Sequence, residues 1–315
     1  MSTSSRLALG VDIGGTSTKL GLVSAEGVIT APRKIVTDAL GDDPTPFLAR
    51  LDAAIESLWD HAGQELAGIG VSTHGEVDPA RRGPIIAGNT PALRNFDLRG
   101  HLEARFGCRV VLNNDLTAHT LGEYHFGCGR GVGRFMCMAM GTGLGAGVIV
   151  DGRPLIIDGG NSGNTGLVVL DPHGPLDNNG IRGSAEALCG VRGIERLARE
   201  RYGHAVTARD VIDAARIGDD PVAGAIMRQV GEYLGHTLAI LSVIFYPQRI
   251  AITGGTTAAG DVLLQATRDT FEVLVGGFFR DIAAHTGGHF HEAEIVLGER
   301  GSEAGLLGST IELFA

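Results

Sequence analysis

Two glycine-rich turns of the same kind, at residues 12–16 and 140–147, constrain the fold of this chain most. The first reads Asp-Ile-Gly-Gly-Thr and lies between apolar runs at 7–11 and 20–23. The second reads Met-Gly-Thr-Gly-Leu-Gly-Ala-Gly and follows the apolar run 135–139. A single turn of this kind is weak evidence, because any tight hairpin favours glycine. Two copies predict a chain of two halves that each begin with a β-hairpin.

The chemistry of these turns suits nucleotide phosphates. Glycine lets backbone N–H groups approach phosphate oxygens closely. The carboxylate of Asp12, at the end of the first apolar run, is a ligand type that hydrated Mg²⁺ prefers. We therefore predict two phosphate-binding turns that face each other across a cleft.

Composition narrows the class of protein. A chain of 315 residues that is 43% hydrophobic and 20% charged can bury the cores of two domains. The 49 glycines are about twice the usual share. A net charge of −10 argues against a nucleic-acid partner, because phosphate backbones require clustered Lys and Arg. No signal peptide and no apolar run of about 20 residues are present, which predicts a cytoplasmic protein with no membrane partner.

The periodicity of apolar residues predicts a mixed α/β organisation in both halves. In the first half we expect strands at 7–13, 19–23, 27–36, 68–73 and 109–113, with helices from Thr45 and at 98–106. In the second half we expect strands at 249–253 and 294–297 and helices at 184–201, 207–217, 221–244, 261–274 and from Ser302. The predicted domains are 1–116 and 117–301, with the last helix, 302–315, packing back on the first.

Two further segments carry candidate chemistry. A strand ends at Asn114-Asp115 and runs into a helical pattern, and ligands of α/β folds gather at such strand ends. Asp115 alone is more simply a helix N-cap, but beside two phosphate turns it fits a general base that accepts the proton of an attacking hydroxyl. Gly254 and Gly255 follow another strand, and their lack of side chains suits an adenine ring as well as a plain strand-to-helix turn.

These motifs, in this order over roughly residues 8–310, resemble the ROK family of sugar kinases (repressor, open reading frame, kinase). That family belongs to the actin, hexokinase and Hsp70 superfamily. The resemblance implies an α/β fold of two ribonuclease-H-like (actin-like ATPase) domains, each a mixed five-stranded sheet with flanking helices, with a cleft between them. It also implies ATP-dependent and Mg²⁺-dependent phosphorylation of a primary hydroxyl of a sugar-like substrate by a homodimer.

The resemblance assigns roles by motif. Asp12 meets Mg²⁺ through water, and Asn114 binds a substrate hydroxyl while Asp115 deprotonates the attacking one. The ATP phosphates are assigned to Gly14, Gly15, Thr16, Gly141, Thr142 and Gly143, and adenosine to Gly254 and Gly255. Lys19 adds charge near the phosphates or lies on a solvated strand face.

The chain departs from the family pattern after the second turn. The family carries Gly-Glu-x-Gly-His and then Cys-x-Cys-Gly-x-x-Gly-Cys-x-Glu, which supply a structural zinc site. Here Leu167 replaces the histidine, and Asp177, Asn179 and Ser184 replace the cysteines. Without thiolate or imidazole ligands we predict that no zinc is bound.

The same segment suggests an altered substrate. Glu186 is retained as a hydrogen-bond acceptor, whereas Asn164 stands where a carboxylate is usual, and neutral acceptors bind hydroxyls less strongly. An amino or deoxy sugar, or a C7-cyclitol, therefore fits better than plain glucose. The alternative is that Asn161, Thr165 and water restore a glucose site. Asn89 is a further candidate substrate ligand.

Other features leave alternatives open. His285, His289 and His291 have metal-like spacing but read more simply as an exposed loop with incidental histidines. His74 and Glu76 follow a strand and suit either the cleft or a polar turn. The competing functions are a sugar-responsive repressor, which the acidic charge and the eleven residues before Asp12 disfavour, and a catalytically silent sugar-binding protein.

Overall fold

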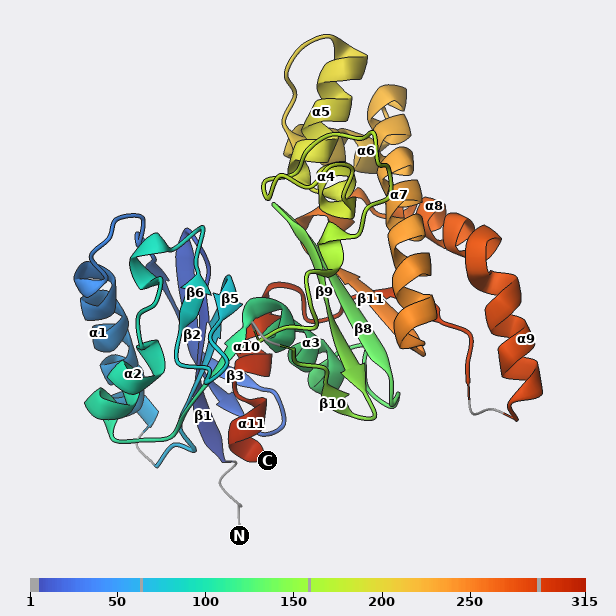
Figure 1. The fold of residues 1–315 in the computed structure, drawn as a ribbon. Coiled ribbons are helices and arrows are strands. Elements are labelled where there is room, and N and C mark those ends of the chain that lie inside the picture. Colours follow the sequence, from blue (N-terminus) through green and yellow to red (C-terminus); the bar gives the residue numbers. More distant parts are fainter. Residues whose placement is uncertain (1–5, 63–64, 158–159, 288–289) are drawn as a thin grey trace. The chain divides into compact units, whose positions relative to one another are not determined.

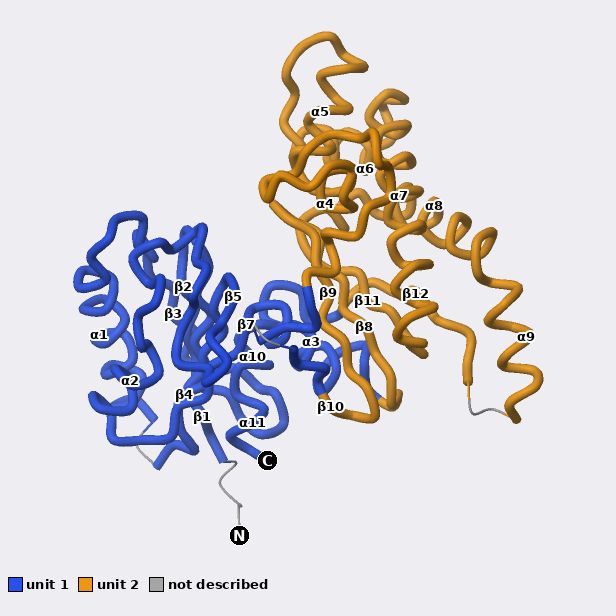
Figure 2. The backbone as a smooth tube through the Cα atoms, in the orientation of Figure 1, with its two compact units in different colours: residues 1–130, 154–163, 299–315 blue, residues 131–153, 164–298 orange. Residues whose placement is uncertain are grey.

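The computed structural model describes residues 6–62, 65–157, 160–287 and 290–315. The chain divides into two compact units (Figure 2). Unit 1 consists of residues 1–130, 154–163 and 299–315, and unit 2 of residues 131–153 and 164–298. The first unit thus continues to residue 130, beyond the expected boundary at 116, and it takes in the C-terminal helices.

Unit 1 contains a five-stranded mixed sheet of order β3-β2-β1-β4-β7 (Figure 1). Its strands are β1 (Leu7–Ile13), β2 (Ser17–Ser24), β3 (Ile29–Val36), β4 (Ile69–Thr73) and β7 (Val110–Asn114). The first three strands form an antiparallel meander, while β1, β4 and β7 run parallel. The carboxyl ends of β1, β4 and β7 therefore lie at one edge, where Asp12 pairs in register with Ser72 and Thr73 with Asn114.

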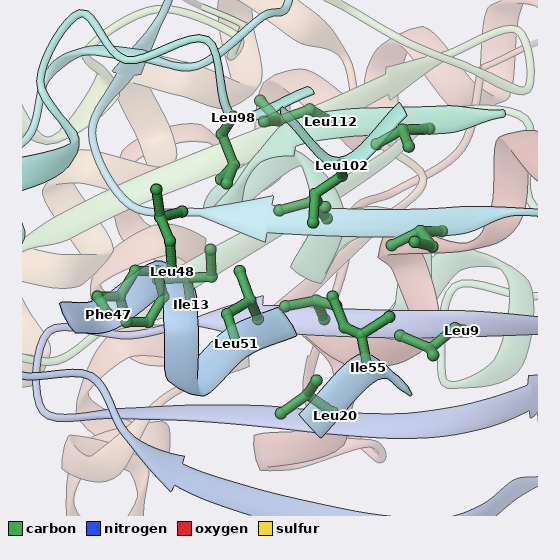
Figure 3. Close-up of a cluster of buried hydrophobic side chains, with 14 of the residues drawn as sticks. Leu9, Ile13, Leu20, Phe47, Leu48, Leu51, Ile55, Leu98, Leu102 and Leu112 are labelled. Carbon is green, nitrogen blue, oxygen red and sulfur yellow. The ribbon is translucent and has the colours of Figure 1, made fainter. Parts of the chain in front are cut away.

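Helices α1 (Thr45–Ala62) and α2 (Leu98–Phe106) share the hydrophobic core of this sheet (Figure 3). The predicted apolar stripe of α1 is buried, and Leu51 and Ile55 pack with Leu9 and Leu20 of the sheet in one cluster. Between β4 and α2 the chain forms a small hairpin, β5 (Glu76–Val77) and β6 (Pro84–Ile86), and a short turn at Pro91–Leu93. This hairpin was not predicted.

A second helical layer in unit 1 joins segments from distant parts of the sequence. It contains α3 (Asp115–Phe126), α10 (Ala304–Ser309) and α11 (Ile311–Phe314). Glycines allow α3 and α10 to approach closely: a Cβ atom on Gly122 would lie 2.1 Å from the carbonyl oxygen of Ala304. This packing of α3 against α10 is why unit 1 extends past residue 116.

Unit 2 repeats the plan with a sheet of order β10-β9-β8-β11-β12. Its strands are β8 (Phe135–Met140), β9 (Leu144–Val150), β10 (Arg153–Pro154), β11 (Arg249–Thr253) and β12 (Glu294–Leu297). Strands β8 and β9 form an antiparallel hairpin, and β11 runs parallel to both β8 and β12. The two predicted β-hairpin starts are therefore present in the two sheets.

The helices of unit 2 are α4 (Ala185–Cys189), α5 (Val191–Tyr202), α6 (Ala208–Ile217), α7 (Pro221–Phe245), α8 (Asp261–Phe271) and α9 (Gly277–His285).

The predicted helix at 184–201 is wrong as a single element. Gly190 is extended (φ −69°, ψ 171°), so α4 ends and α5 begins at this residue. The predicted end at residue 274 is also wrong. A π-turn at Glu272–Gly276 keeps helical dihedral angles through the glycines and leads directly into α9.

In the described part of the chain, no helix combines the length and the apolar character that crossing a membrane requires.

Candidate active site

The first glycine-rich turn connects β1 and β2 in unit 1. The Gly14 N–H donates to the Ser17 carbonyl (3.1 Å), and the Thr37 hydroxyl donates to the Gly14 carbonyl (2.7 Å). A Cβ atom on Gly15 would lie 2.8 Å from the Cβ of Asn89, so Asn89 is packed directly against this turn. The structure thus brings two predicted site residues together, and glycine at position 15 is required by the close approach.

Asp12 ends β1 beside this turn. Its Oδ1 accepts a hydrogen bond from the Ser72 hydroxyl of β4 (2.8 Å). Burial raises the Asp12 pKa, while the Ser72 hydrogen bond and the charges of Lys19 and His119 act in the opposite direction. A half-buried carboxylate that keeps a second oxygen for another ligand is well suited to a hydrated cation.

Lys19 lies opposite Asp12 in the β1–β2 register, and its Nζ donates to the carbonyl of Ser302 (2.7 Å). This contact places the ammonium on the side of the sheet that carries α10, so Lys19 is neither wholly solvated nor free of the Asp12 carboxylate. The two roles considered for Lys19, added charge near the phosphates and a solvated strand face, both stay predictions.

Asp115 is the first residue of α3, and Asn114 is the N-cap. The Asn114 Oδ1 accepts from the Leu116 N–H (2.9 Å), while its Nδ2 donates to the Gly75 carbonyl (2.8 Å). Asp115 itself accepts from the Leu116 N–H through Oδ1 (2.9 Å). The capping role considered for Asp115 therefore belongs mainly to Asn114, whose amide is largely engaged within the chain.

His74 and Glu76 lie on the loop that leaves β4. The His74 Nδ1 is 3.4 Å from the Asp115 Oδ2, and each side chain is 38% exposed. The hydrogen bond to Asp115 raises the His74 pKa, partly offset by burial. Glu76 accepts a hydrogen bond from the Asn161 amide (3.4 Å). A histidine directly after a parallel strand was the only sequence signal for the pairing with Asp115.

In unit 2, the second glycine-rich turn connects β8 and β9. The Gly141 N–H donates to the Gly143 carbonyl (2.9 Å), which closes the turn. The Glu186 Oε2 accepts from the Leu144 N–H (3.2 Å), and a Cβ atom on Gly143 would lie 2.6 Å from this oxygen. Glu186, predicted to bind substrate hydroxyls, thus contacts the glycine-rich turn of its own unit.

The third glycine turn follows β11 of the same sheet. Gly254 has φ +95°, and a Cβ atom there would lie 2.1 Å from the Met140 carbonyl oxygen. Only glycine combines this backbone conformation with this approach. The third turn therefore lies beside the second one in unit 2, as a nucleotide that spans both would require.

The residues considered for an altered substrate preference belong to different units. In unit 2, Asn164 is exposed and precedes a turn at Thr165–Leu167. The Thr165 hydroxyl is buried and accepts from the Ala146 N–H (2.6 Å), so it serves β9. Asn161 belongs to unit 1, where it contacts Glu76. The side chains proposed to restore a glucose site are therefore both engaged within the chain.

The positions that match the zinc-binding cysteines form a closed hydrogen-bonded loop. The Asp177 carboxylate accepts from the Asn179 N–H (2.8 Å), the Ile181 N–H (2.9 Å) and the Ser184 hydroxyl (2.6 Å). Ser184 also caps α4 by accepting from the Ala187 N–H (3.1 Å). This donor set does not fit zinc, which is bound by thiolates, imidazoles and carboxylates with free lone pairs.

Of the histidine-rich loop, His289 lies outside the described residues. The His285 Nδ1 lies 2.7 Å from the Asp281 carbonyl oxygen in α9, and His291 is exposed. Among the residues that the structure describes, no three His, Cys, Asp or Glu side chains converge as a metal site would require.

Two units that each hold a mixed five-stranded sheet, a glycine-rich hairpin turn and flanking helices define the class of proteins with the actin-like ATPase fold. Within that class, a family model described as ROK family matches residues 8–311. The chain therefore belongs to the ROK family.

Individual relatives refine this placement. A glucokinase of Thermotoga maritima is 32% identical over 283 residues, covering 83% of this chain and 86% of the relative. The solved structure of a ROK family glucokinase from Streptomyces griseus, in complex with glucose and AMPPNP, is similar with a TM-score of 0.76 and 29% identity, covering 96% of this chain and 97% of that one. The Escherichia coli transcriptional regulator NagC is 32% identical over 212 residues, but these cover 64% of this chain and 52% of NagC.

Proposed function

We propose that this protein is a sugar kinase that transfers the γ-phosphate of ATP to a primary hydroxyl of a sugar or sugar-like cyclitol. The observation that carries the proposal is the position of Asp115, at the start of α3 directly after the parallel strand β7. Asp12 ends β1 of the same sheet, with β4 between the two strands. Similarity to glucokinases over most of the chain supports the same reaction class.

In the proposed reaction, Asp115 accepts the proton of the attacking hydroxyl. The hydroxyl oxygen forms a bond to the γ-phosphorus, the bond from that phosphorus to the β–γ bridging oxygen breaks, and ADP leaves. General base catalysis of this kind contributes about 10²–10⁴-fold, and positioning with charge neutralisation supplies much of the remainder. Asp115 is part-exposed, so a substrate hydroxyl has access to its carboxylate.

Backbone N–H groups of the two glycine-rich turns are proposed to hold the phosphates. Gly14 and Gly141 donate within their own turns. In the part of the chain that the structure describes, the N–H groups of Gly15, Thr16 and Thr142 donate to no protein acceptor, so they are available to phosphate oxygens. Gly254 and Gly255 are proposed to lie against adenosine.

Mg²⁺, when bound with ATP, supplies charge neutralisation on the phosphate oxygens. Asp12 is the residue proposed to hold it, through water. Ser72 fixes the Asp12 carboxylate by its hydrogen bond to Oδ1, which leaves Oδ2 to accept from a metal-bound water. One carboxylate suffices, because Mg²⁺ in such sites takes its other ligands from water and substrate phosphates.

The substrate is proposed to differ from plain glucose, as an amino sugar or a C7-cyclitol. Asn164 provides a neutral group where the family has a carboxylate, and Thr165 is committed to the backbone of β9. A panel of hexoses, amino sugars and cyclitols in an ADP-release assay identifies the substrate. Glucose with the highest kcat/KM of the panel would contradict an altered specificity.

The general-base role is tested with Asp115→Asn. This variant should fold and bind ATP as the unmodified protein does, because Asn keeps the side-chain shape and an oxygen acceptor for the Leu116 N–H. Phosphoryl transfer should fall by about 10²–10⁴-fold, since the amide cannot accept the proton. ADP release with the best substrate measures the loss, and Asp219→Asn, on an exposed residue of unit 2, is the matched control.

Near-native turnover by Asp115→Asn would refute the assignment of Asp115 as the general base.

The alternative function is a catalytically silent sugar-binding protein, and the similarity to the transcriptional regulator NagC supports it. Isothermal titration separates the two: a protein that binds a sugar in the presence of ATP but never releases ADP fits the alternative.

A further inference from the structure

We propose that His74 is a positioning residue for Asp115, which orients its carboxylate by a hydrogen bond from Nδ1 and, by gaining or losing a proton, makes phosphoryl transfer depend on pH. The inference rests on the proposed kinase function. It gives the proposed base, Asp115, a partner that can gain or lose a proton.

The sheet register places the two residues side by side. Thr73 of β4 is paired with Asn114 of β7, and His74 and Asp115 directly follow the ends of these two parallel strands. The loop after His74 is held by the Asn114 amide, which donates to the Gly75 carbonyl (2.8 Å). Gly75 has φ +95°, and a Cβ atom there would lie 1.8 Å from the Ile86 carbonyl oxygen, so only glycine fits this turn.

The carboxylate of Asp115 is therefore fixed from two directions. Its Oδ1 accepts from the Leu116 N–H (2.9 Å), and its Oδ2 faces the His74 Nδ1 (3.4 Å). Each oxygen keeps a lone pair for a substrate hydroxyl. The separation of 3.4 Å is long for a hydrogen bond, and such contacts shorten when substrate binds and water leaves.

Other charged groups on neighbouring elements interact with Asp115 or with Asp12. Asp12 on β1 interacts electrostatically with Asp115, and Lys19 on β2 and His119 on α3 interact with Asp12. Glu76 lies on the same loop as His74, with its carboxylate at the Asn161 amide. Among the described residues, only Asp115 of these charged groups is within hydrogen-bonding distance of His74. The interaction between His74 and Asp115, called the dyad below, is therefore the strongest electrostatic coupling of His74.

The two protonation states of His74 have different effects on the base. Neutral His74 donates from Nδ1 and orients Asp115 without adding charge. Protonated His74 gives Asp115 a full ion pair, which lowers the affinity of its carboxylate for the substrate proton. Because Asp115 raises the His74 pKa above its ordinary value of 6.5, the phosphoryl-transfer rate should rise with pH through a transition above 6.5.

The test compares His74→Ala and His74→Asn with the unmodified protein and with His61→Asn, a control on an exposed histidine at the end of α1. Asn keeps a donor near the position of Nδ1 but cannot titrate. The single-turnover transfer rate of His74→Ala should fall about 10–100-fold, as for other groups that orient a reacting side chain, with little change in sugar KM. His74→Asn should recover most of the rate and lose the pH transition.

A second measurement does not depend on turnover. NMR titration of His74 should show a lower pKa in Asp115→Asn than in the unmodified protein, and a smaller change in Glu76→Gln. If no substrate is ever phosphorylated while this shift is present, the proposed function fails and the dyad stands. If turnover is normal but the His74 pKa is the same in Asp115→Asn as in the unmodified protein, the inference is overturned. It is also overturned if His74→Ala keeps the transfer rate and the pH profile of the unmodified protein.

Discussion

At the scale of single residues, the carboxylate of Glu123 in α3 joins two distant segments of unit 1. It is fully buried and accepts from the Glu299 N–H (3.0 Å), the Arg300 N–H (2.7 Å) and the Cys128 N–H (3.4 Å). Buried charges persist only when they are paired or hydrogen-bonded. Glu123 therefore links the last turns of α3 to residues 299–300, where the third segment of unit 1 begins.

Glu123→Ala should lower the free energy of unfolding by about 3 kcal/mol, because the N–H groups of Cys128, Glu299 and Arg300 lose their acceptor, and an N–H left unsatisfied in the interior costs about 1–3 kcal/mol. Urea unfolding measures the change. Glu232→Ala, on an exposed position of α7, is the control and should stay within about 0.5 kcal/mol of the unmodified protein. An unfolding midpoint for Glu123→Ala equal to that of the control would contradict this role.

At the scale of elements, the loop 177–184 shows how the family's zinc segment keeps its spacing without the metal ligands. Its hydrogen bonds converge on the Asp177 carboxylate. Burial alone would raise the Asp177 pKa, but the hydrogen bonds from Ser184, Ile181 and Asn179 outweigh it and lower the pKa. A depressed carboxylate pKa means that the native loop prefers the ionised form.

The sign of the pH dependence follows from that depression. Stability from Asp177 is fully present above the unfolded pKa of 3.8 and is lost as the pH falls through the lower folded value. Asp177→Asn should therefore destabilise the protein at pH 7 and weaken its loss of stability between about pH 5 and pH 2. Thermal unfolding at several pH values tests this, with Asp261→Asn as the control.

The zinc prediction belongs to the same element. Elemental analysis of the purified protein should find no stoichiometric zinc, and a chelator should leave the thermal midpoint unchanged, since the loop is closed by its own hydrogen bonds. Zinc at one equivalent per chain would refute the prediction that residues 167–184 bind no zinc.

At the scale of the whole molecule, unit 1 is assembled from three chain segments. Helix α10 packs on α3, and a Cβ atom on Gly308 would lie 1.7 Å from the Ala118 carbonyl oxygen. The buried residues Val23, Phe126, Leu306 and Leu307 complete a small core around this contact. The stability of the first unit thus depends on residues at the opposite end of the sequence.

Gly308→Ala should destabilise unit 1 by several kcal/mol. The added methyl group would overlap the backbone of α3, and helix backbone cannot move aside as a flexible side chain can. Hydrogen exchange should show the loss of protection in β1, β4 and β7 rather than in β8 and β11. Gly277→Ala is the matched control: its surroundings are open and its backbone helical, so it should be neutral or slightly stabilising. Equal protection in both variants would contradict the prediction.

Much of the fold was predictable because its signals are local. The bounds of β1, α2 and β12 agree with the predicted ranges, since apolar periodicity and flanking turn residues define them. The break at Gly190 and the continuation through Gly276 are not specified by apolar periodicity, because glycine is found both at helix ends and within helices. The pairing of His74 with Asp115 depends on the register of β4 and β7, which no local pattern specifies. The same is true of the commitment of Asn114, Thr165 and Glu186 to backbone groups.

The order in which the segments of unit 1 occur has a consequence for biosynthesis. A nascent chain that has not yet reached residue 304 has no α10 to cover α3, so Ala118 and Phe126 stay open to solvent. Unit 2 lies within residues 131–298 and is translated in full before that point. On the ribosome, unit 2 can therefore fold before unit 1 is complete. The core of unit 1 closes only when the last helices, α10 and α11, have been synthesised.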